Sequence, residues 1–166
     1  MSLRDALARK KRRETHYDIV LISSDEQDAL EERFTDCKRR LALAEIRNAT
    51  DSDDAEAART ELEEVRDALR GATHRVRFQS LPPDEYEALV SAHPPTKEQQ
   101  AAKEVWDEQT FAPALIAACA VDSDMTAEDW KAELASGRWS TSDKATLFIQ
   151  ALEANVVPRS VTVPKG

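Results

Sequence analysis

The sequence predicts a mainly α-helical chain with a small two-stranded antiparallel β-ribbon, a long antiparallel helical hairpin and a C-terminal helical bundle. In two long stretches, separated by a polar turn, apolar residues recur at alternating spacings of three and four, as they do in paired helices. A short segment of alternating polar and apolar residues, the pattern of a strand, lies on the outer side of each stretch. The low content of glycine, 3 residues, and of aromatics, 5%, fits a helical protein with a modest core.

The second alternating segment, residues 73–81, organises the rest of the chain. Val76 and Phe78 share one face of this predicted strand. Pro82-Pro83 then ends the strand and begins a helix, because proline is tolerated in the first helical turn.

The first alternating segment, residues 15–23, is predicted to pair with it in the antiparallel sense, because closing the hairpin brings the two together. Its run Ile19-Val20-Leu21-Ile22 is apolar on both faces, so we expect at least part of it to be covered twice. A two-stranded ribbon is marginal alone, so it needs a helix on its face or strands from another subunit.

The helical hairpin is predicted from its caps and its apolar seams. Ser23 with Glu26, or Ser24 with Gln27, forms a capping box for the first helix. Gly71 is well placed as the C′ residue of the second helix, which is predicted over about residues 54–70. The seams consist of Leu30, Phe34, Cys37, Leu41 and Ala44 in the first helix, and Ala55, Ala58, Leu62, Val65 and Leu69 in the second.

Short helices are predicted to follow the helix that starts at Pro83. Thr96 begins one that reaches about Trp106, Thr110 caps the next, and Thr126 caps a third that ends at Gly137. Ser140 or Ser142 opens the last helix, whose predicted inner side is Leu147, Phe148, Ala151, Leu152 and Asn155. The predicted divisions are a basic N-terminal helix (1–14), the ribbon with the inserted hairpin (15–81), the C-terminal helical domain (82–156) and a flexible tail (157–166).

Charge separates the N-terminal segment from the rest. Residues 1–14 hold six basic and two acidic residues, a net +4 in a chain whose formal charge is −9. The acidic total argues against nucleic-acid binding by the whole chain. Lys10-Lys11-Arg12-Arg13 fits a nucleic-acid or membrane patch, or a cationic helix end docked on an acidic neighbour, and we favour the second. No segment approaches the roughly 20 apolar residues of a membrane span.

The residues show no catalytic constellation, and we expect no enzyme activity, no cofactor and no metal site. His16 and His74 could face each other across the ribbon. We favour a structural pair over a metal site as the interpretation of these two histidines. Cys37 and Cys119 are expected to be free buried thiols. The partner-binding candidates are Trp106, Phe111, Trp130 and Trp139, and the alternative for the tryptophans is that they fill a small helical core.

Several stretches then carry a resemblance to a known family. They are Val-Arg-Phe-Gln-Ser-Leu-Pro-Pro-Asp-Glu-Tyr (76–86), Ala-His-Pro-Pro-Thr-Lys-Glu-Gln (92–99), Thr-Phe-Ala-Pro-Ala-Leu-Ile-Ala-Ala-Cys (110–119), Met-Thr-Ala-Glu-Asp-Trp (125–130) and Ala-Leu-Glu-Ala-Asn (151–155). With the basic N-terminus, a strand and a charged helical hairpin before them, the chain resembles the tail assembly chaperones of long-tailed bacteriophages that infect actinobacteria. The resemblance covers about residues 3–155.

The resemblance implies a non-enzymatic viral protein that binds the tape measure protein before tail polymerisation, with tail tube subunits as a further expected client. It implies a place in the host cytoplasm during infection and absence from the mature virion. It also implies a longer product made by ribosomal frameshifting, for which codons of Val163-Pro164-Lys165 could hold the slippery site. The alternative function is a structural virion component of the tail or head–tail region, and homo-oligomer formation is left open.

Overall fold

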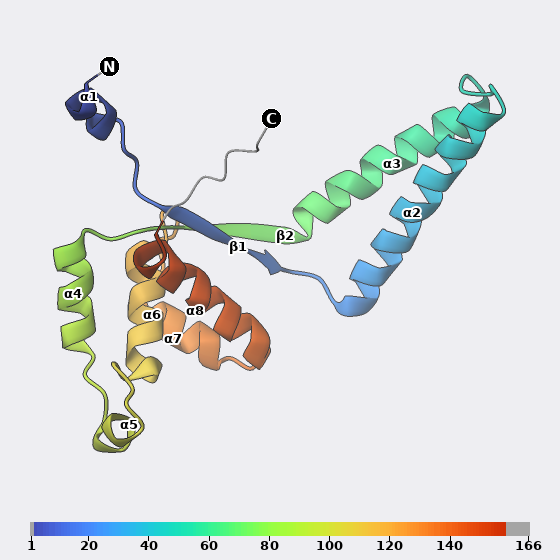
Figure 1. Ribbon diagram of the computed structural model, residues 1–166. Helices are drawn as coiled ribbons and strands as arrows, with labels where there is room; N and C mark the ends of the chain where they lie inside the picture. Colours follow the sequence, from blue (N-terminus) through green and yellow to red (C-terminus); the bar gives the residue numbers. More distant parts are fainter. Residues whose placement is uncertain (1, 159–166) are drawn as a thin grey trace. The chain divides into compact units, whose positions relative to one another are not determined.

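The computed structural model describes residues 2–158, and Figure 1 labels its elements. Eight helices and a two-stranded antiparallel sheet form this part of the chain, which confirms the predicted fold class. From residue 159 onward the predicted tail, including Val163 to Lys165, lies outside the described residues. The elements are α1 (Leu3–Ala8), β1 (Glu14–Val20), α2 (Ser24–Ile46), α3 (Asp53–Gly71), β2 (Thr73–Gln79), α4 (Pro83–Ala92), α5 (Lys97–Ala101), α6 (Glu108–Cys119), α7 (Ala127–Ala135) and α8 (Thr141–Val156).

The chain folds as two compact units. One is Asp18–Arg75, and the other combines Met1–Tyr17 with Val76–Gly166. We call them the hairpin unit and the C-terminal unit. The predicted division assigned the whole ribbon to the hairpin, whereas the two units share it. Each unit is described separately below.

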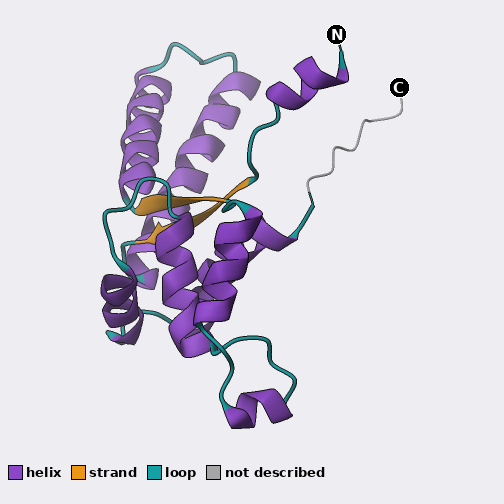
Figure 2. Ribbon diagram, turned by 90° about the vertical axis from the view of Figure 1, so that its left-hand side faces the viewer, coloured by secondary structure: helices purple, strands orange, loops and turns teal. Residues whose placement is uncertain are grey.

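In the hairpin unit, α2 and α3 lie side by side (Figures 1 and 2). The capping box that starts α2 is the one between Ser23 and Glu26. The polar turn contains Asn48, whose φ of 53° is a left-handed conformation that asparagine tolerates. The prediction for Gly71 was wrong, because Gly71 is the last helical residue and the C-cap, Ala72, keeps a right-handed conformation. Local helix geometry, rather than a glycine turn, therefore leads the chain into β2.

The two predicted seams meet between the helices. Cys37 and Ala44 are buried from α2, and Ala55, Ala58, Leu62 and Val65 are buried from α3. Burial raises the pKa of the Cys37 thiol, which keeps it protonated and unreactive. At the edge of the seam, the Arg40 guanidinium bonds Asp54 at 2.8 Å and Glu61 at 3.0 Å. The contact between α2 and α3 is therefore a thin apolar strip bordered by ion pairs.

The register of the ribbon places Arg13 opposite Ser80 and Leu21 opposite Ala72, as shown by the bonds Ser80 N–Arg13 O, 2.9 Å, and Leu21 N–Ala72 O, 2.8 Å. The predicted inward face of β2 is confirmed, since Val76 is 9% exposed and Phe78 is fully buried.

The apolar run of the first strand, of which at least part was expected to be covered on both faces, is only partly covered. Val20 is 49% exposed and Leu21 is 61% exposed, whereas Ile19 and Ile22 are half-buried. The strand itself ends at Val20, and Ser23 serves as the cap of α2. The run therefore leaves Val20 and Leu21 exposed and is not a fully covered central strand.

The beginning of β1 is fixed to α8 by side chains on one strand face. The Thr15 hydroxyl donates to Gln150 O at 2.6 Å, and the Tyr17 hydroxyl donates to Asp143 Oδ1 at 2.9 Å. Burial and the Asp143 carboxylate raise the pKa of Tyr17 to about 12. Asp143 lies in the first turn of α8, whose N-cap is Ser140, and its pKa is lowered mainly by its hydrogen bond from Ser140.

Some predicted helix limits need correction. The basic N-terminal helix covers only Leu3–Ala8, and Lys10 to Arg13 are not helical, since Arg13 already pairs with Ser80. The helix after Thr96 ends at Ala101 instead of Trp106. Two residues after this end, Lys103 adopts a left-handed conformation with a φ of 62°. Asp107, not Thr110, caps α6.

The inner side of α8 was partly misassigned. Leu147 and Ala151 are fully buried as predicted, and Ala154 is also buried. Phe148 and Leu152 are only half-buried. The buried face of α8 is therefore rotated slightly about the helix axis from the predicted face, toward Ala154, and Phe148 is partly exposed. Gly137 follows α7 with a φ of 81°, in agreement with its predicted role as a helix stop.

The C-terminal unit should fold without the helical hairpin, because its buried side chains Phe78, Phe111, Leu115, Ile116 and Leu147 all come from its own segments. Replacing residues 26–70 with a short turn should preserve α4–α8 and shift the thermal midpoint by less than about 8 °C. Circular dichroism during heating measures this. The shortened chain carrying Phe78→Asp is the control and should not fold. Loss of cooperative unfolding in the shortened chain itself would show that the units depend on each other.

The two tyrosines should ionise only above the ordinary pKa of 10.0, because burial raises the pKa of both Tyr17 and Tyr86. The folded-state pKa of Tyr17 exceeds its unfolded value, so its link to Asp143 stabilises the fold below pH 10 and is lost as pH rises toward 12. Absorbance titration of the phenolate measures this, with Tyr86→Phe isolating Tyr17. Asp143→Asn should lower the Tyr17 pKa, and an unchanged titration would rule out the carboxylate as a cause.

Candidate functional site

The strongest candidate for a partner-binding surface is a group of aromatic rings around Phe111, which we call the Phe111 cluster. Trp106 stacks on Phe111 with ring centroids 4.7 Å apart and an interplanar angle of 29°. Phe148 lies 6.1 Å from Phe111 and 6.5 Å from Trp106, in edge-to-face geometry. Tyr86 at 6.4 Å and His93 at 6.1 Å complete the cluster. Offset-stacked and edge-to-face pairs at these distances are favourable for aromatic rings.

The rings of the cluster come from α4 and its C-cap, from the loop before α6, from α6 and from α8. The cap of α6 positions the central ring, Phe111. Asp107 is the N-cap, so Trp106 occupies N′ and Phe111 occupies N4, which are the two positions of a hydrophobic staple. The Asp107 N–H donates to His93 O at 3.0 Å, which ties this loop to the end of α4. The Gln99 amide donates to Asp107 Oδ1 at 3.2 Å and lowers the pKa of that carboxyl. The Trp106 ring is therefore held by its stacking on Phe111 and by the backbone bond of the next residue, Asp107, to His93.

The exposure of the rings distinguishes the centre of the cluster from its edge. Phe111 is fully buried, whereas Trp106, Phe148, Tyr86 and His93 are half-buried. Next to Trp106, Val105 is 62% exposed. Large aromatic side chains that are rigid and partly exposed are typical anchors of protein interfaces. The cluster can therefore supply an ordered apolar surface to another protein.

A shallow depression lies beside the cluster and shares His93 with it, and Asp107, the N-cap of α6, also lines the depression. Pro113 and Ala114 of α6 and Ala127 of α7 supply small or apolar walls, and Glu128 and Lys131 supply polar ones. Thr110 also lines the depression, and its hydroxyl donates to Asp107 Oδ2 at 3.2 Å within the first turn of α6. The small and apolar walls suit an apolar side chain of a partner.

The four predicted partner-binding residues take different places. Phe111 and Trp130, at 0% and 3% exposure, are core residues, and a partner cannot reach them in this conformation. They are therefore removed from the binding assignment. The Trp130 indole N–H has no hydrogen-bond partner within the described residues. Trp106 and Trp139 are half-buried and remain candidates.

Trp139 has a structural role as well. Its Nε1 donates to Glu133 Oε1 at 2.9 Å, across the turn between α7 and α8. Glu133 also pairs with Arg138, and this bond chiefly lowers the pKa of Glu133. The ring therefore holds the turn, and Trp106 is the stronger of the two remaining candidates.

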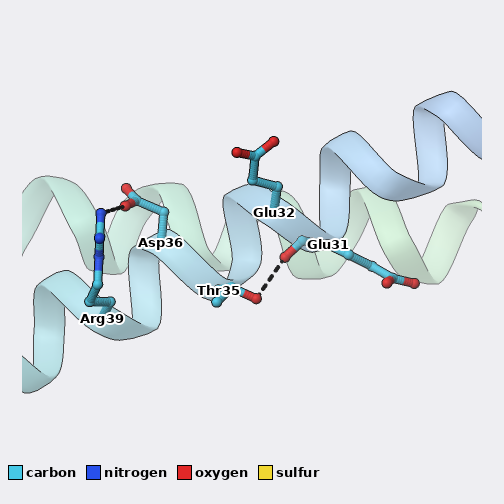
Figure 3. Close-up of a pocket in the computed structure, with 5 residues that line it drawn as sticks. All are labelled: Glu31, Glu32, Thr35, Asp36 and Arg39. Carbon is cyan, nitrogen blue, oxygen red and sulfur yellow. Dashed lines mark hydrogen bonds and ion pairs between the residues drawn. The ribbon is translucent and has the colours of Figure 1, made fainter.

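The outer face of α2 is polar (Figure 3). Glu31, Glu32, Thr35, Asp36 and Arg39 line a shallow depression there. The Thr35 hydroxyl donates to Glu31 O at 2.9 Å, and the Arg39 guanidinium pairs with Asp36. Since these bonds are local to one helix, the face is a solvated charged surface, as the sequence pattern predicts.

Histidines and cysteines do not form a metal site in the part of the chain that the structure describes. No group of three or more His, Cys, Asp or Glu residues within 2–158 is arranged to hold a metal ion. The ribbon register places His16 opposite Arg77 rather than opposite His74, so the expected histidine pair was wrong. Cys37 and Cys119 are free and buried, as predicted.

Comparisons of the chain with protein-family models, with curated proteins and with solved structures gave no match. None of the helices within residues 2–158 has the length and apolarity that crossing a bilayer requires.

Sequence reasoning identified Trp106 and Phe111 but did not predict that they stack, nor that Tyr86, His93 and Phe148 join them. The available signal was the staple. Asp107 is a good N-cap residue, with a tryptophan before it and a phenylalanine four positions after it. Assigning the cap to Thr110 concealed this relationship. The contribution of Phe148 depends on the packing of α8 and has no local signal.

Replacing the centre of the cluster should cost much more stability than replacing its edge. Phe111→Ala should lower the free energy of unfolding by roughly 3–5 kcal/mol, because it leaves a cavity among buried rings. Trp106→Ala should cost about half as much, because that ring is partly exposed. Urea unfolding measures both, and Val105→Ala serves as a near-neutral control. Equal costs at Phe111 and Trp106 would contradict the division into centre and edge.

Proposed function

We propose that this chain is a non-enzymatic assembly chaperone that binds an apolar helical segment of a client protein through the Trp106 side of the Phe111 cluster. The observation that carries the proposal is the partly exposed Trp106 ring, which stacks on the buried Phe111 ring with centroids 4.7 Å apart and lies beside the exposed Val105. A preformed aromatic surface loses little side-chain freedom on binding, so it suits repeated capture and release of a client.

The client that fits best is the tape measure protein of a long-tailed bacteriophage that infects actinobacteria, with tail tube subunits as a second client. The resemblance of residues 3–155 to the tail assembly chaperones supports this assignment. The chemistry is compatible with it, because an acidic carrier with a limited apolar surface can cover a long apolar helix and keep it from aggregating. On this proposal the chain acts in the host cytoplasm and is absent from the finished particle.

A co-expression experiment tests the surface. The affinity-tagged full chain is produced together with the tape measure protein encoded by the same genome, and the client recovered in the soluble complex is measured. Val105→Asp should weaken the complex by about tenfold or more, because it places a charge in the contact. Val121→Asp is the matched control, since Val121 is 45% exposed and lies outside the cluster. Equal recovery with both variants would reject the proposed surface.

Composition of purified particles separates the proposal from its alternative. A chaperone should be absent from the particles or strongly depleted when they are analysed by mass spectrometry. A fixed copy number per particle would instead identify a structural component of the tail or the head–tail region.

A further inference from the structure

The N-terminal helix α1 presents an apolar stripe that no other described residue of its own unit buries. Leu3 is 75% exposed and Leu7 is 58% exposed, and the two lie one turn apart. All six residues of the helix are exposed, and its capping box between Ser2 and Asp5 is its main local support. A six-residue helix is marginal in water, so its order has to come from a surface against which it packs.

A groove of matching character lies at the base of the hairpin unit. Half of its lining residues are alanine or glycine, and a Cβ added at Gly71 would meet no atom within 4 Å, so the groove is open there. Leu21, 61% exposed, precedes the lining residue Ile22. We call it the hairpin groove, and its lining consists of Ile22, Glu26, Ala29, Leu30, Arg33, Ala68, Gly71 and Ala72.

Charge is complementary between the two surfaces. Residues 18–75 carry sixteen acidic and nine basic side chains, a net charge of −7, whereas residues 1–14 carry +4. The lining holds one acidic residue, Glu26, and one basic residue, Arg33, which is paired with Glu61 at 3.3 Å. Asp25 precedes Glu26 in the first turn of α2. Arg4 lies within α1 and five basic residues follow the helix, so cations flank the two leucines. Opposite charges around an apolar contact favour association and orient it.

A second copy is the occupant that fits this charge pattern. Each chain carries both the basic segment 1–14, at +4, and the acidic residues 18–75, at −7, so two copies offer each other oppositely charged surfaces.

We propose that two copies of this chain associate by reciprocal exchange of α1, each placing Leu3 and Leu7 in the hairpin groove of the other. Each chain has one α1 and one hairpin groove, so in a two-fold symmetric dimer both helices and both grooves are occupied. No binding surface is then left for a third copy. This pairing is separate from the proposed client surface, because it uses neither Trp106 nor Val105.

The test measures the molar mass of the full chain by light scattering across a dilution series. The wild type should show a two-chain species of twice 18.6 kDa. Leu3→Asp/Leu7→Asp and Ala29→Glu/Ala68→Glu should each weaken the pair at least about tenfold, since all four positions are exposed and tolerate the change in the free chain. Ile46→Asp, at a 77% exposed residue of α2 outside the groove, is the matched control and should leave it unchanged. Added salt should weaken the wild-type pair.

Mixing the two double variants distinguishes exchange between chains from other arrangements. The mixture should regain a two-chain species, because one intact α1 can still enter one intact groove. A monomeric wild type would overturn the proposal, and protection of residues 9–13 from protease in that monomer would place α1 on its own chain. A pair that survives either double variant, or a mixture that stays monomeric, would also overturn it. Circular dichroism of each variant excludes unfolding as the cause.

Discussion

The C-terminal unit depends on β2 being hydrogen-bonded along both of its edges. On one edge Ser80 N donates to Arg13 O at 2.9 Å. On the other, Val121 N donates to Arg77 O at 2.9 Å, and Phe78 forms an antiparallel bridge with Ala120. Phe78 lies between these pairings and is fully buried. Because buried backbone groups need partners, the strand fixes where α6 must end.

Asn155 extends this constraint to the end of the strand and to α8. Its Oδ1 accepts from Leu81 N at 2.8 Å, and its Nδ2 donates to Ala151 O at 2.9 Å and to Cys119 Sγ at 3.3 Å. The ends of β2, α6 and α8 are therefore held together by one side chain. Pro83 then starts α4 at once, which brings Tyr86 to Phe111. The aromatic cluster is thus a consequence of how β2 is anchored.

The sequence predicted best the features that local chemistry decides. Capping boxes at Ser23, Thr96 and Thr126 involve residues three positions apart, so their hydrogen bonds can be read from the sequence. The seams of the hairpin follow from helical periodicity alone, and so does the inward face of β2. Cys37 and Val65 are buried because their spacing places them between the two helices.

The features that tertiary contacts decide were less predictable. Asp107 and Thr110 are both good cap residues, and the choice between them depends on stacking of Trp106 on Phe111 and on the bond from Asp107 N to His93 O. Exposure of Leu21 likewise cannot be read from its apolar neighbours, because burial depends on what lies over the strand. A periodic pattern shows which face can be buried, but only the assembled chain shows whether anything covers it.

The two exposed apolar features differ in what holds them, and this difference bears on how each would bind. Trp106 is held by a stack, a staple and a capped helix, so its surface is ordered before a partner arrives. Helix α1 has six residues and a capping box, so most of its order has to be gained on contact. A segment that becomes ordered on binding pays an entropy cost, so its affinity is lower for a given contact area. Complementary charge between the two surfaces can then strengthen the association. The proposed client surface at Trp106 is therefore ordered before binding, whereas the proposed exchange of α1 would order that helix only on contact with a second copy.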